Sequence, residues 1–179
     1  LHNIVSHPII LHDLRSTQRL AQEVTAHGAK AIKTRVGHSF IKDLMRKNHA
    51  LFASELAAHY YFKEFFYCDN AILTAIFVLE ILSQKQLPLS EIVAEYATYA
   101  KIPETNFKVA DKEKTLQKIK EVFSGHTIEE LDGISVIADT WWANIRASNT
   151  EPLLRLNMEA HTNKELQEIK VKFESLLQE

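Results

Sequence analysis

The stretch Pro8-Ile9-Ile10-Leu11-His12-Asp13-Leu14-Arg15-Ser16 indicates how the first half of the chain folds. Its opening residues form a short apolar run, which is typical of a buried strand, and polar residues follow where that strand would end. Ser16 is then expected to cap a helix that ends at Gly28. A strand followed directly by a helix is the start of a βαβ unit and favours an α/β fold.

The alternation of strand and helix continues through the first half of the chain. Residues 30–36 and 50–53 are expected to form strands, with a helix at 39–47 between them. A long aromatic loop is expected to run to Asp69. The helix that follows, at 71–83, is apolar nearly all round and is expected to be buried. This order predicts a three-layer-like α/β domain with a mostly parallel sheet.

Polar side chains follow each of the three expected strands. Arg15 follows the first strand and His38 follows the second, while Glu55 and His59 follow the third. The carboxyl ends of parallel strands meet at one edge of a sheet, where ligands usually bind. Carboxylates accept hydrogen bonds from hydroxyl pairs, and Arg and His donate to oxygens. Each residue alone is more often structural, but together they indicate a polyol or sugar site at this edge.

A linker separates the two halves of the chain. Residues 84–104 contain Pro88 and Pro103 around one short expected helix, and we place the domain boundary near 98–104. The expected domains are therefore 1–100 and 101–179.

The second half is expected to run strand, helix, three strands, helix. This order predicts a small α+β domain with helices covering one face of an antiparallel sheet. Asp111 is expected to cap the first helix, and Thr162 with Glu165 forms a capping box for the last one. The last helix carries one apolar stripe, made by Leu166, Ile169, Phe173, Leu176 and Leu177.

The run Arg146-Ala147-Ser148-Asn149-Thr150-Glu151-Pro152 joins two strand-like segments of the second half. A guanidinium can meet two phosphate oxygens at once, and the short polar residues after it add further donors in a turning loop. We therefore interpret this run as a candidate phosphate site. An ordinary polar hairpin turn is the alternative, because short polar loops are common.

Composition excludes several classes of protein. Lys and Arg number 21 against 23 for Asp and Glu, and the net charge of -2 argues against a nucleic-acid partner. No apolar run is long enough to span a bilayer, so no membrane association is expected. The single cysteine suits a reducing compartment, and we expect a cytoplasmic protein. Despite nine histidines, no two lie one helical turn apart with a third ligand, so no metal ligands are predicted.

Four segments, in order along the chain, resemble motifs of the α-D-phosphohexomutase superfamily, which includes phosphomannomutases and phosphoglucomutases. They are the segments 13–16, Val36-Gly37-His38-Ser39-Phe40-Ile41-Lys42, Ser54-Glu55-Leu56-Ala57-Ala58-His59-Tyr60-Tyr61-Phe62 and 146–152. The resemblance covers nearly the whole chain. It implies the third and fourth domains, the C-terminal fragment, of such a mutase.

The resemblance implies an activity for the parent enzyme and a role for each matching residue. That isomerase interconverts mannose or glucose 6-phosphate and 1-phosphate through a phosphoserine and a hexose 1,6-bisphosphate, with Mg²⁺. The N-terminal domains of the full-length parent enzyme would supply the phosphoserine and the Mg²⁺ ligands. Neither Ser-His-Asn-Pro nor Asp-Gly-Asp-x-Asp-Arg occurs here, so this fragment alone is expected to be inactive. The implied site residues are Arg15, Glu55 and His59 for the substrate, His38 and His59 for catalytic assistance, and Arg146, Ser148, Asn149 and Thr150 for the phosphate.

Departures from the family pattern leave the preferred sugar open. Ser54, Ala57 and Ala58 stand where the family usually has Gly, Ser and Gly, so neither mannose nor glucose phosphate is favoured. The chain starts at Leu1 and is expected to be a piece of something longer. A free-standing, non-catalytic module that binds sugar phosphates is the alternative to a fragment of a mutase.

Overall fold

The computed structural model describes residues 7–148 and 151–178 of the chain. It consists of two compact units, residues 1–98 (unit 1) and 99–179 (unit 2). Each unit has a sheet and a hydrophobic core of its own.

Unit 1 is built on a five-stranded sheet with the order β2-β1-β3-β4-β5. Strand β1 pairs in parallel with both β2 and β3, which confirms the parallel sheet expected for these three. Strands β4 and β5 continue the sheet in antiparallel pairing. The strand bounds are β1 Ile9–Asp13, β2 Lys30–Thr34, β3 Phe52–Ser54, β4 Tyr60–Phe62 and β5 Cys68–Asp69.

Strands β4 and β5 lie where a long aromatic loop was expected, so that part of the prediction is wrong. Both strands are short, and Tyr60-Tyr61-Phe62 has no alternation of polar and apolar residues that would mark a strand. Only the pairing with β3 shows that Tyr61 faces the core, where it is fully buried.

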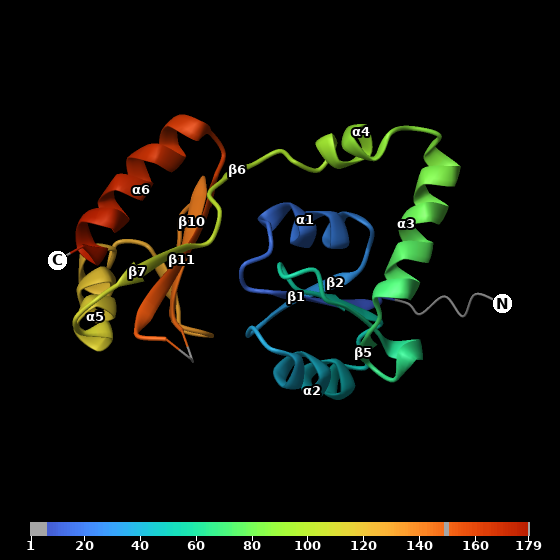
Figure 1. The fold of residues 1–179 in the computed structure, drawn as a ribbon, viewed down its shortest axis with the longest axis horizontal. Helices are drawn as coiled ribbons and strands as arrows, with labels where there is room; N and C mark the ends of the chain where they lie inside the picture. The colour runs from blue at the N-terminus through green and yellow to red at the C-terminus, as the bar shows by residue number, and fades with distance from the viewer. Residues whose placement is uncertain (1–6, 149–150, 179) are drawn as a thin grey trace. The chain divides into compact units, whose positions relative to one another are not determined.

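Helices cover both faces of the sheet in unit 1. Figure 1 shows α1 and α2 on opposite sides of strands β1 and β2. Helix α2 buries Ile41 and Met45 against Leu11 of β1. The helix bounds are α1 Gln18–Ala26, α2 His38–Asn48, the 3-10 turn η1 Lys63–Phe65, α3 Ala71–Lys85 and α4 Leu89–Ala94.

The cap of helix α1 differs from the prediction by one residue. The side chain of Thr17, and not that of Ser16, accepts a hydrogen bond from the backbone N–H of Arg19. Ser16 instead donates through its Oγ to a carboxylate oxygen of Asp13, at 3.2 Å. An ionised carboxylate is a stronger acceptor than the alternatives open to this hydroxyl, which accounts for the shift.

The expectation that the helix at 71–83 is buried is wrong. Helix α3 has no buried residue, and Ile72 and Leu79 are 76% and 64% exposed. One side of α3 forms an apolar groove of about 690 Å³ with the sheet, in which the ring of Phe77 stacks on that of Phe62. Several of its other apolar side chains are exposed, among them Ile72, Ile76 and Leu79. No helix in the described ranges, α3 included, combines the length and hydropathy needed to cross a membrane.

Unit 2 is built on an antiparallel sheet with the order β6-β11-β10-β9-β8, and β7 also pairs with β11. Helices α5 and α6 lie on one face of this sheet (Figure 1), which confirms the predicted α+β arrangement. The short strands β6 and β8 were not expected. The bounds are β6 Ala100–Lys101, β7 Thr105–Lys108, α5 Lys112–Val122, β8 Thr127–Glu129, β9 Ile134–Ile137, β10 Trp141–Ala147, β11 Leu153–Ala160 and α6 Asn163–Leu177.

The caps and the apolar stripe of unit 2 follow the sequence closely. Asp111 accepts from the N–H of Lys114 at 3.0 Å, and Thr162 accepts from the N–H of Glu165 at 3.2 Å. The stripe of α6 is buried against alternate residues of β11, as predicted. Its fully or nearly fully buried members are Leu166, Ile169, Phe173 and Leu177.

Gly133 lets the chain pass close to the neighbouring strand β10. Its φ is +72°, and a Cβ atom at this position would lie 2.2 Å from the carbonyl oxygen of Ile145. Only glycine fits so close to another backbone in this conformation. Strand β9, which starts at the next residue, can therefore pair along β10 in register with Asn144 and Ile145.

Candidate functional site

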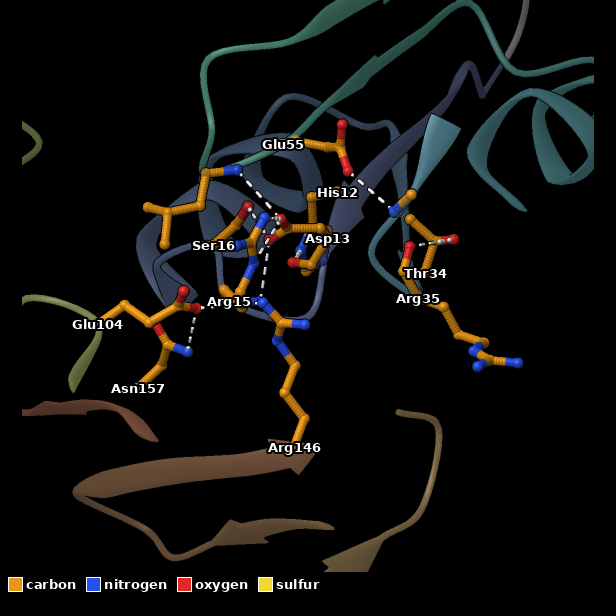
Figure 2. Close-up of polar contacts among 12 residues, drawn as sticks. His12, Asp13, Arg15, Ser16, Thr34, Arg35, Glu55, Glu104, Arg146 and Asn157 are labelled. Carbon is orange, nitrogen blue, oxygen red and sulfur yellow. Dashed lines mark hydrogen bonds and ion pairs between the residues drawn. The ribbon is translucent and has the colours of Figure 1, made fainter. Parts of the chain in front are cut away.

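The loops after β1, β2 and β3 form a polar edge of the sheet in unit 1, which we call the strand-end rim (residues 13–16, 35–38 and 55–59). Asp13, fully buried at the end of β1, joins two of these loops. Its carboxylate accepts from the N–H of Leu56 in the loop after β3, at 3.1 Å, and from Arg15 and Ser16 in its own loop (Figure 2). A buried carboxylate needs such donors to offset the loss of water.

Arg15 is tied to Asp13 by two guanidinium nitrogens. Its Nε and Nη2 atoms lie 3.0 and 2.6 Å from the same carboxylate oxygen, and its side chain is 7% exposed. The structure therefore places the guanidinium of Arg15 at the rim. Its orientation is fixed by Asp13, which the sequence reading did not anticipate as its partner.

Glu55 lies at the centre of the rim and is held from two sides. One carboxylate oxygen accepts from the N–H of Gly37 at 3.0 Å, and the other accepts from the hydroxyl of Tyr61 at 2.7 Å. Burial, and after it the hydrogen bond to Glu55, raise the pKa of Tyr61 far above its ordinary value, so the tyrosine stays a donor. Each oxygen of Glu55 keeps one lone pair for a further donor.

His38 and His59 lie beside Glu55 and face each other edge to face, with ring centroids 4.4 Å apart. The Nδ1 atoms of His59 and His38 lie 3.0 and 3.4 Å from the carboxylate of Asp69, at the end of β5. Burial works to raise the pKa of Asp69, but the hydrogen bond from His59 and the nearby imidazoles hold that pKa below its ordinary value. The two imidazoles are thus oriented by an ionised carboxylate.

Ala58 adopts a backbone conformation that glycine favours. Its φ is 62°, in the left-handed region, within the turn closed by its own N–H and the carbonyl of Glu55. An alanine pays a steric cost there that a glycine does not. The family resemblance puts a glycine at this position, so the present chain keeps the turn at a cost in strain.

In unit 2 two arginines share one carboxylate, an arrangement that we call the arginine cluster (Glu104, Arg146, Arg155 and Asn157). The carboxylate of Glu104 accepts from the Nη2 atom of Arg146 at 3.3 Å and from the amide of Asn157 at 3.0 Å (Figure 2). It also accepts from the Nη1 atom of Arg155, at 3.5 Å. The Nε atoms of both arginines are buried and have no hydrogen-bond partner among the described residues. The cluster thus already binds one anionic group, the carboxylate of Glu104, and keeps two guanidinium N–H donors without a partner among the described residues.

Arg146 is a strand residue and not a loop residue, which corrects the expected hairpin boundary. Strand β10 continues through Ala147, and Arg146 pairs directly opposite Arg155 of β11. The side chains of directly opposed residues lie on the same face of a sheet. Two like charges therefore lie side by side, and they need an anion between them.

The loop between β10 and β11 is only partly described. Asn149 and Thr150, two of the four predicted phosphate ligands, lie outside the described residues. The Oγ of Ser148 accepts from the N–H of Glu151 at 3.3 Å and from Arg155 at 3.4 Å. The ammonium of Lys112, at the start of α5, donates to the carbonyl oxygen of Glu151 at 3.0 Å and lies 3.5 Å from that of Ser148. Lys112 therefore fixes both ends of this loop.

Several residues of both clusters were missed by sequence reasoning. The alternation of β11 carried one available signal: if Leu154 and Leu156 face the core, Arg155 and Asn157 must share the opposite face with each other. Glu104 carried no such signal, because it is 42 residues from Arg146 along the chain. Asp69 was expected only as the end of a long loop. The pairing of β5 with β4 is what places its carboxylate beside His38 and His59.

The metal-ligand chemistry of the described residues does not fit Mg²⁺. The one group of three or more candidate ligands found among them is His38, Glu55 and His59, and it is rich in nitrogen. Mg²⁺ prefers an octahedron of oxygens and retains several waters. No step of a reaction is therefore assigned to Mg²⁺ bound by these residues.

Taken separately, the two clusters offer complementary chemistry. The rim offers acceptors on Glu55 and imidazoles that can donate or accept protons, which suits hydroxyl groups. The arginine cluster offers a forked pair of guanidiniums, which suits a phosphate or a carboxylate.

Comparison with known proteins matches both units. Residues 2–99 match the family described as phosphoglucomutase/phosphomannomutase, alpha/beta/alpha domain III. Residues 104–176 match the phosphoglucomutase/phosphomannomutase C-terminal domain. Together the two matches cover most of the chain.

Individual relatives give the same result. A phosphomannomutase of Methanocaldococcus jannaschii is 43% identical over 159 residues, which are 89% of this chain and 35% of that protein. A phosphomannomutase of Escherichia coli K12 is 34% identical over 166 residues, or 91% of this chain and 36% of that protein. A crystal structure of a phosphoglucomutase/phosphomannomutase family protein from Burkholderia thailandensis superposes with a TM-score of 0.81 at 26% identity, over 96% of this chain and 37% of that one. The chain thus spans little more than a third of its relatives' length.

Proposed function

Because the chain belongs to the phosphoglucomutase/phosphomannomutase family, as its third and C-terminal domains, we propose that it is the substrate- and phosphate-binding part of a mutase. The parent enzyme would interconvert a hexose 6-phosphate and a hexose 1-phosphate through a phosphoserine and a hexose 1,6-bisphosphate. Mannose and glucose phosphates are both retained as substrates. Cytoplasmic location stays a prediction.

The arginine cluster is the observation that carries the proposal. A carboxylate held between Arg146 and Arg155 is a planar oxyanion bound by two guanidiniums, and a phosphate presents the same kind of acceptor with more oxygens. The buried Nε atoms of both arginines have no hydrogen-bond partner among residues 7–148 and 151–178, and they would donate to those extra oxygens. We therefore assign phosphate binding to Arg146, with Arg155 and Ser148 beside it. Asn149 and Thr150 are kept as predicted ligands.

The strand-end rim would bind the sugar. Glu55 would accept from ring hydroxyls with the lone pairs that Gly37 and Tyr61 leave unused. His59 and His38 would donate to sugar oxygens or hold a proton at Nε2, because their Nδ1 atoms face Asp69. Arg15 would present the guanidinium that Asp13 orients to the substrate. A rigid set of partners keeps these groups in one geometry, which favours binding.

The transferable phosphoryl group and Mg²⁺ would come from the remaining part of the parent enzyme. Mg²⁺ would neutralise charge on the phosphoryl oxygens during transfer. The residues of this chain would hold the sugar and the phosphate that is not transferred. The 179-residue chain alone is therefore expected to bind hexose phosphate without turning it over.

Calorimetric titration of the 179-residue chain with mannose 6-phosphate and glucose 6-phosphate tests the proposal. Loss of one charge-assisted contact costs about 1.5–3 kcal/mol, so Arg146→Ala should weaken binding by about 10- to 100-fold. Glu55→Gln should weaken hexose phosphate binding but leave the binding of inorganic phosphate unchanged. Arg19→Ala, which removes a half-exposed arginine of α1 paired with Glu23, serves as the control.

Two results would contradict the assignment of Arg146, and a third would contradict the expected inactivity of the chain. Equal affinities of the parent chain and Arg146→Ala would remove Arg146 from the phosphate site. Equal losses in Arg146→Ala and Arg19→Ala would show that general charge, and not the cluster, attracts the ligand. Isomerase turnover by the chain alone would overturn the expectation that it lacks the phosphoryl donor.

A further inference from the structure

Three ligand-type side chains of the strand-end rim converge on one point in unit 1. His38, Glu55 and His59 each offer one ligand atom, and these atoms lie within 4.8 Å of one another. His38 is the first residue of α2, shortly after β2, whereas Glu55 and His59 lie in the loop after β3, so the group exists only in the folded chain. Glu55 is buried, whereas the side chains of His38 and His59 are 45% and 41% exposed.

We propose that His38, Glu55 and His59 form a binding site for a divalent transition metal ion, with Zn²⁺ as the preferred ion. Two imidazoles and one carboxylate are the protein ligands found in one common type of zinc site, in which water or a further ligand takes the fourth position. Mg²⁺ and Ca²⁺ prefer sets of oxygens, so the site should discriminate strongly against both.

The geometry requires only a small movement to close around the ion. Ligand atoms at about 2.0–2.2 Å from Zn²⁺ lie about 3.3–3.6 Å apart in a tetrahedron. The present spacing, at most 4.8 Å, must therefore contract by up to about 1.5 Å. The half-exposed rings of His38 and His59 can supply that movement by rotating about their side-chain bonds. Glu55 need not move, because Gly37 and Tyr61 hold it and leave a lone pair on each oxygen.

Asp69 completes the surroundings that such a site needs. Its carboxylate lies within 3.0 and 3.4 Å of the Nδ1 atoms of His59 and His38. Carboxylates that accept from metal-binding imidazoles orient the rings and raise their basicity. Glu55 as a ligand and Asp69 behind the two rings place two carboxyl groups around the proposed ion.

The ion and a sugar would exclude each other, a consequence that rests on the proposed function. The same three side chains are assigned to the hexose. A bound ion would occupy the lone pairs of Glu55, His38 and His59 with which the hydroxyl groups of the hexose are expected to interact. Zn²⁺ would then act as an inhibitor that competes with hexose phosphate at the rim, independently of any Mg²⁺ site elsewhere in the parent enzyme.

Titration of the 179-residue chain with ZnCl₂, followed by calorimetry, tests the site. We expect one site per chain, at least about tenfold weaker in the double variant His38→Ala/His59→Ala. The single variants His38→Gln and His59→Gln, each with an amide in place of the ring, should each lose part of the affinity. MgCl₂ should give no comparable binding. Far-UV circular dichroism establishes that each variant is folded.

Two control variants separate this site from other zinc ligands. Cys68→Ser removes the chain's only cysteine, next to Asp69 in β5, and His27→Ala removes an exposed histidine at the end of α1. Both should bind Zn²⁺ like the parent chain. The proposal is wrong if the parent chain shows no such site, if the double variant binds equally well, or if Cys68→Ser abolishes binding.

Repeating the ZnCl₂ titration in the presence of mannose 6-phosphate separates this inference from the proposed function. A reduced apparent affinity for Zn²⁺ supports both. Unchanged Zn²⁺ affinity in a chain that binds the sugar phosphate would remove the hexose from Glu55 and the two histidines, while the metal site would stand.

Discussion

Helices α3 and α6 have the same length, 15 residues each, but they differ completely in burial. Helix α3 is the more apolar and has no buried residue, whereas α6 carries many charges and buries Leu166, Ile169, Phe173 and Leu177. A helix that is apolar on all sides can pack only one of its sides against a sheet, so the apolar residues on its other sides stay exposed. A helix with one apolar stripe can bury nearly all of its apolar surface. Pattern, and not average hydropathy, decides which helix stabilises its unit.

The largest expected effect comes from removing a core residue of α6. Phe173 is fully buried and its ring stacks on that of Phe123 at 4.5 Å, so Phe173→Ala should lower the free energy of unfolding of unit 2 by about 3–5 kcal/mol. The matched change in α3, Leu79→Ala, removes a side chain that is 64% exposed and should cost within about 0.5 kcal/mol.

Urea unfolding can measure the two helices separately. Trp141 and Trp142, the chain's only tryptophans, both lie in unit 2, so their fluorescence reports on that unit. Far-UV circular dichroism follows the helices of both units. If Leu79→Ala lowered the free energy of unfolding by several kcal/mol, the contrast between α3 and α6 would be wrong, because the exposed side of α3 would then be covered in solution.

The second expected effect compares two glycines with nearly the same backbone conformation, one in each unit. Gly133 and Gly28 have φ values of +72° and +75°, but a Cβ atom at Gly133 would clash with Ile145, and one at Gly28 would have nothing within 4 Å. Gly133→Ala should therefore destabilise unit 2 by about 1–3 kcal/mol beyond the cost that Gly28→Ala imposes on unit 1.

The measurement is the urea concentration at the midpoint of unfolding for each glycine variant. Tryptophan fluorescence follows unfolding of Gly133→Ala, and circular dichroism follows unfolding of Gly28→Ala. Equal losses in both would show that backbone conformation alone sets the cost and that the close approach of β9 to β10 can relax.

The third expected effect concerns what α3 and α6 share. Asn70 caps α3 by accepting from the N–H of Leu73 at 2.9 Å, and Thr162 caps α6 by accepting from Glu165. Asn70→Ala and Thr162→Ala should each cost about 1 kcal/mol. Thermal unfolding of the two variants would test this. A near-zero cost in Asn70→Ala alone would indicate that the start of α3 frays freely.

The smallest expected effect is a pH dependence of unit 1. Burial, opposed by the hydrogen bond to the Asp13 carbonyl and aided by Lys33, lowers the pKa of His12 from its ordinary value of 6.5. The unfolded chain therefore takes up the proton first, and stability present above pH 6.5 is lost as the pH falls from there toward the lowered pKa. The slope for one proton is at most about 1.4 kcal/mol per pH unit.

His12→Gln removes this titration and gives the control. Urea unfolding, followed by circular dichroism at several pH values below 7, should show that the free energy of unfolding falls less steeply with decreasing pH in the variant than in the unsubstituted chain. Parallel curves would mean that His12 is protonated as easily in the fold as in the unfolded chain.

Much of the fold could be predicted where local chemistry and burial agree. The capping box and stripe of α6 fix both its start and its buried side. The short apolar run 8–12, set before a helix, predicted a parallel strand, and β1 is observed at Ile9–Asp13. Helix α3 was placed correctly by its apolar run, but its burial was predicted wrongly, because a sequence without a polar side gives no information about which side finds a partner.

The candidate site was predicted less completely than the fold. The strand ends indicated Glu55, His38 and His59 because parallel strands deliver their carboxyl ends to one edge. Asp69 and Glu104 could not be found, because each reaches its partners through strands that are short or distant in sequence. Arg146 was identified as a cation but assigned to a loop, because nothing in Arg146-Ala147 marks where a strand stops.

The buried carboxylate of Asp13 has a consequence for how such domains evolve. It accepts hydrogen bonds from its own loop and from the N–H of Leu56 in the loop after β3. An insertion or deletion in the loop after β3 would remove the N–H of Leu56 and leave one carboxylate oxygen of this fully buried acid with one donor fewer, in a place that water does not reach. Lineages of this fold should therefore vary the lengths of these two loops together or not at all, whichever sugar they have come to prefer.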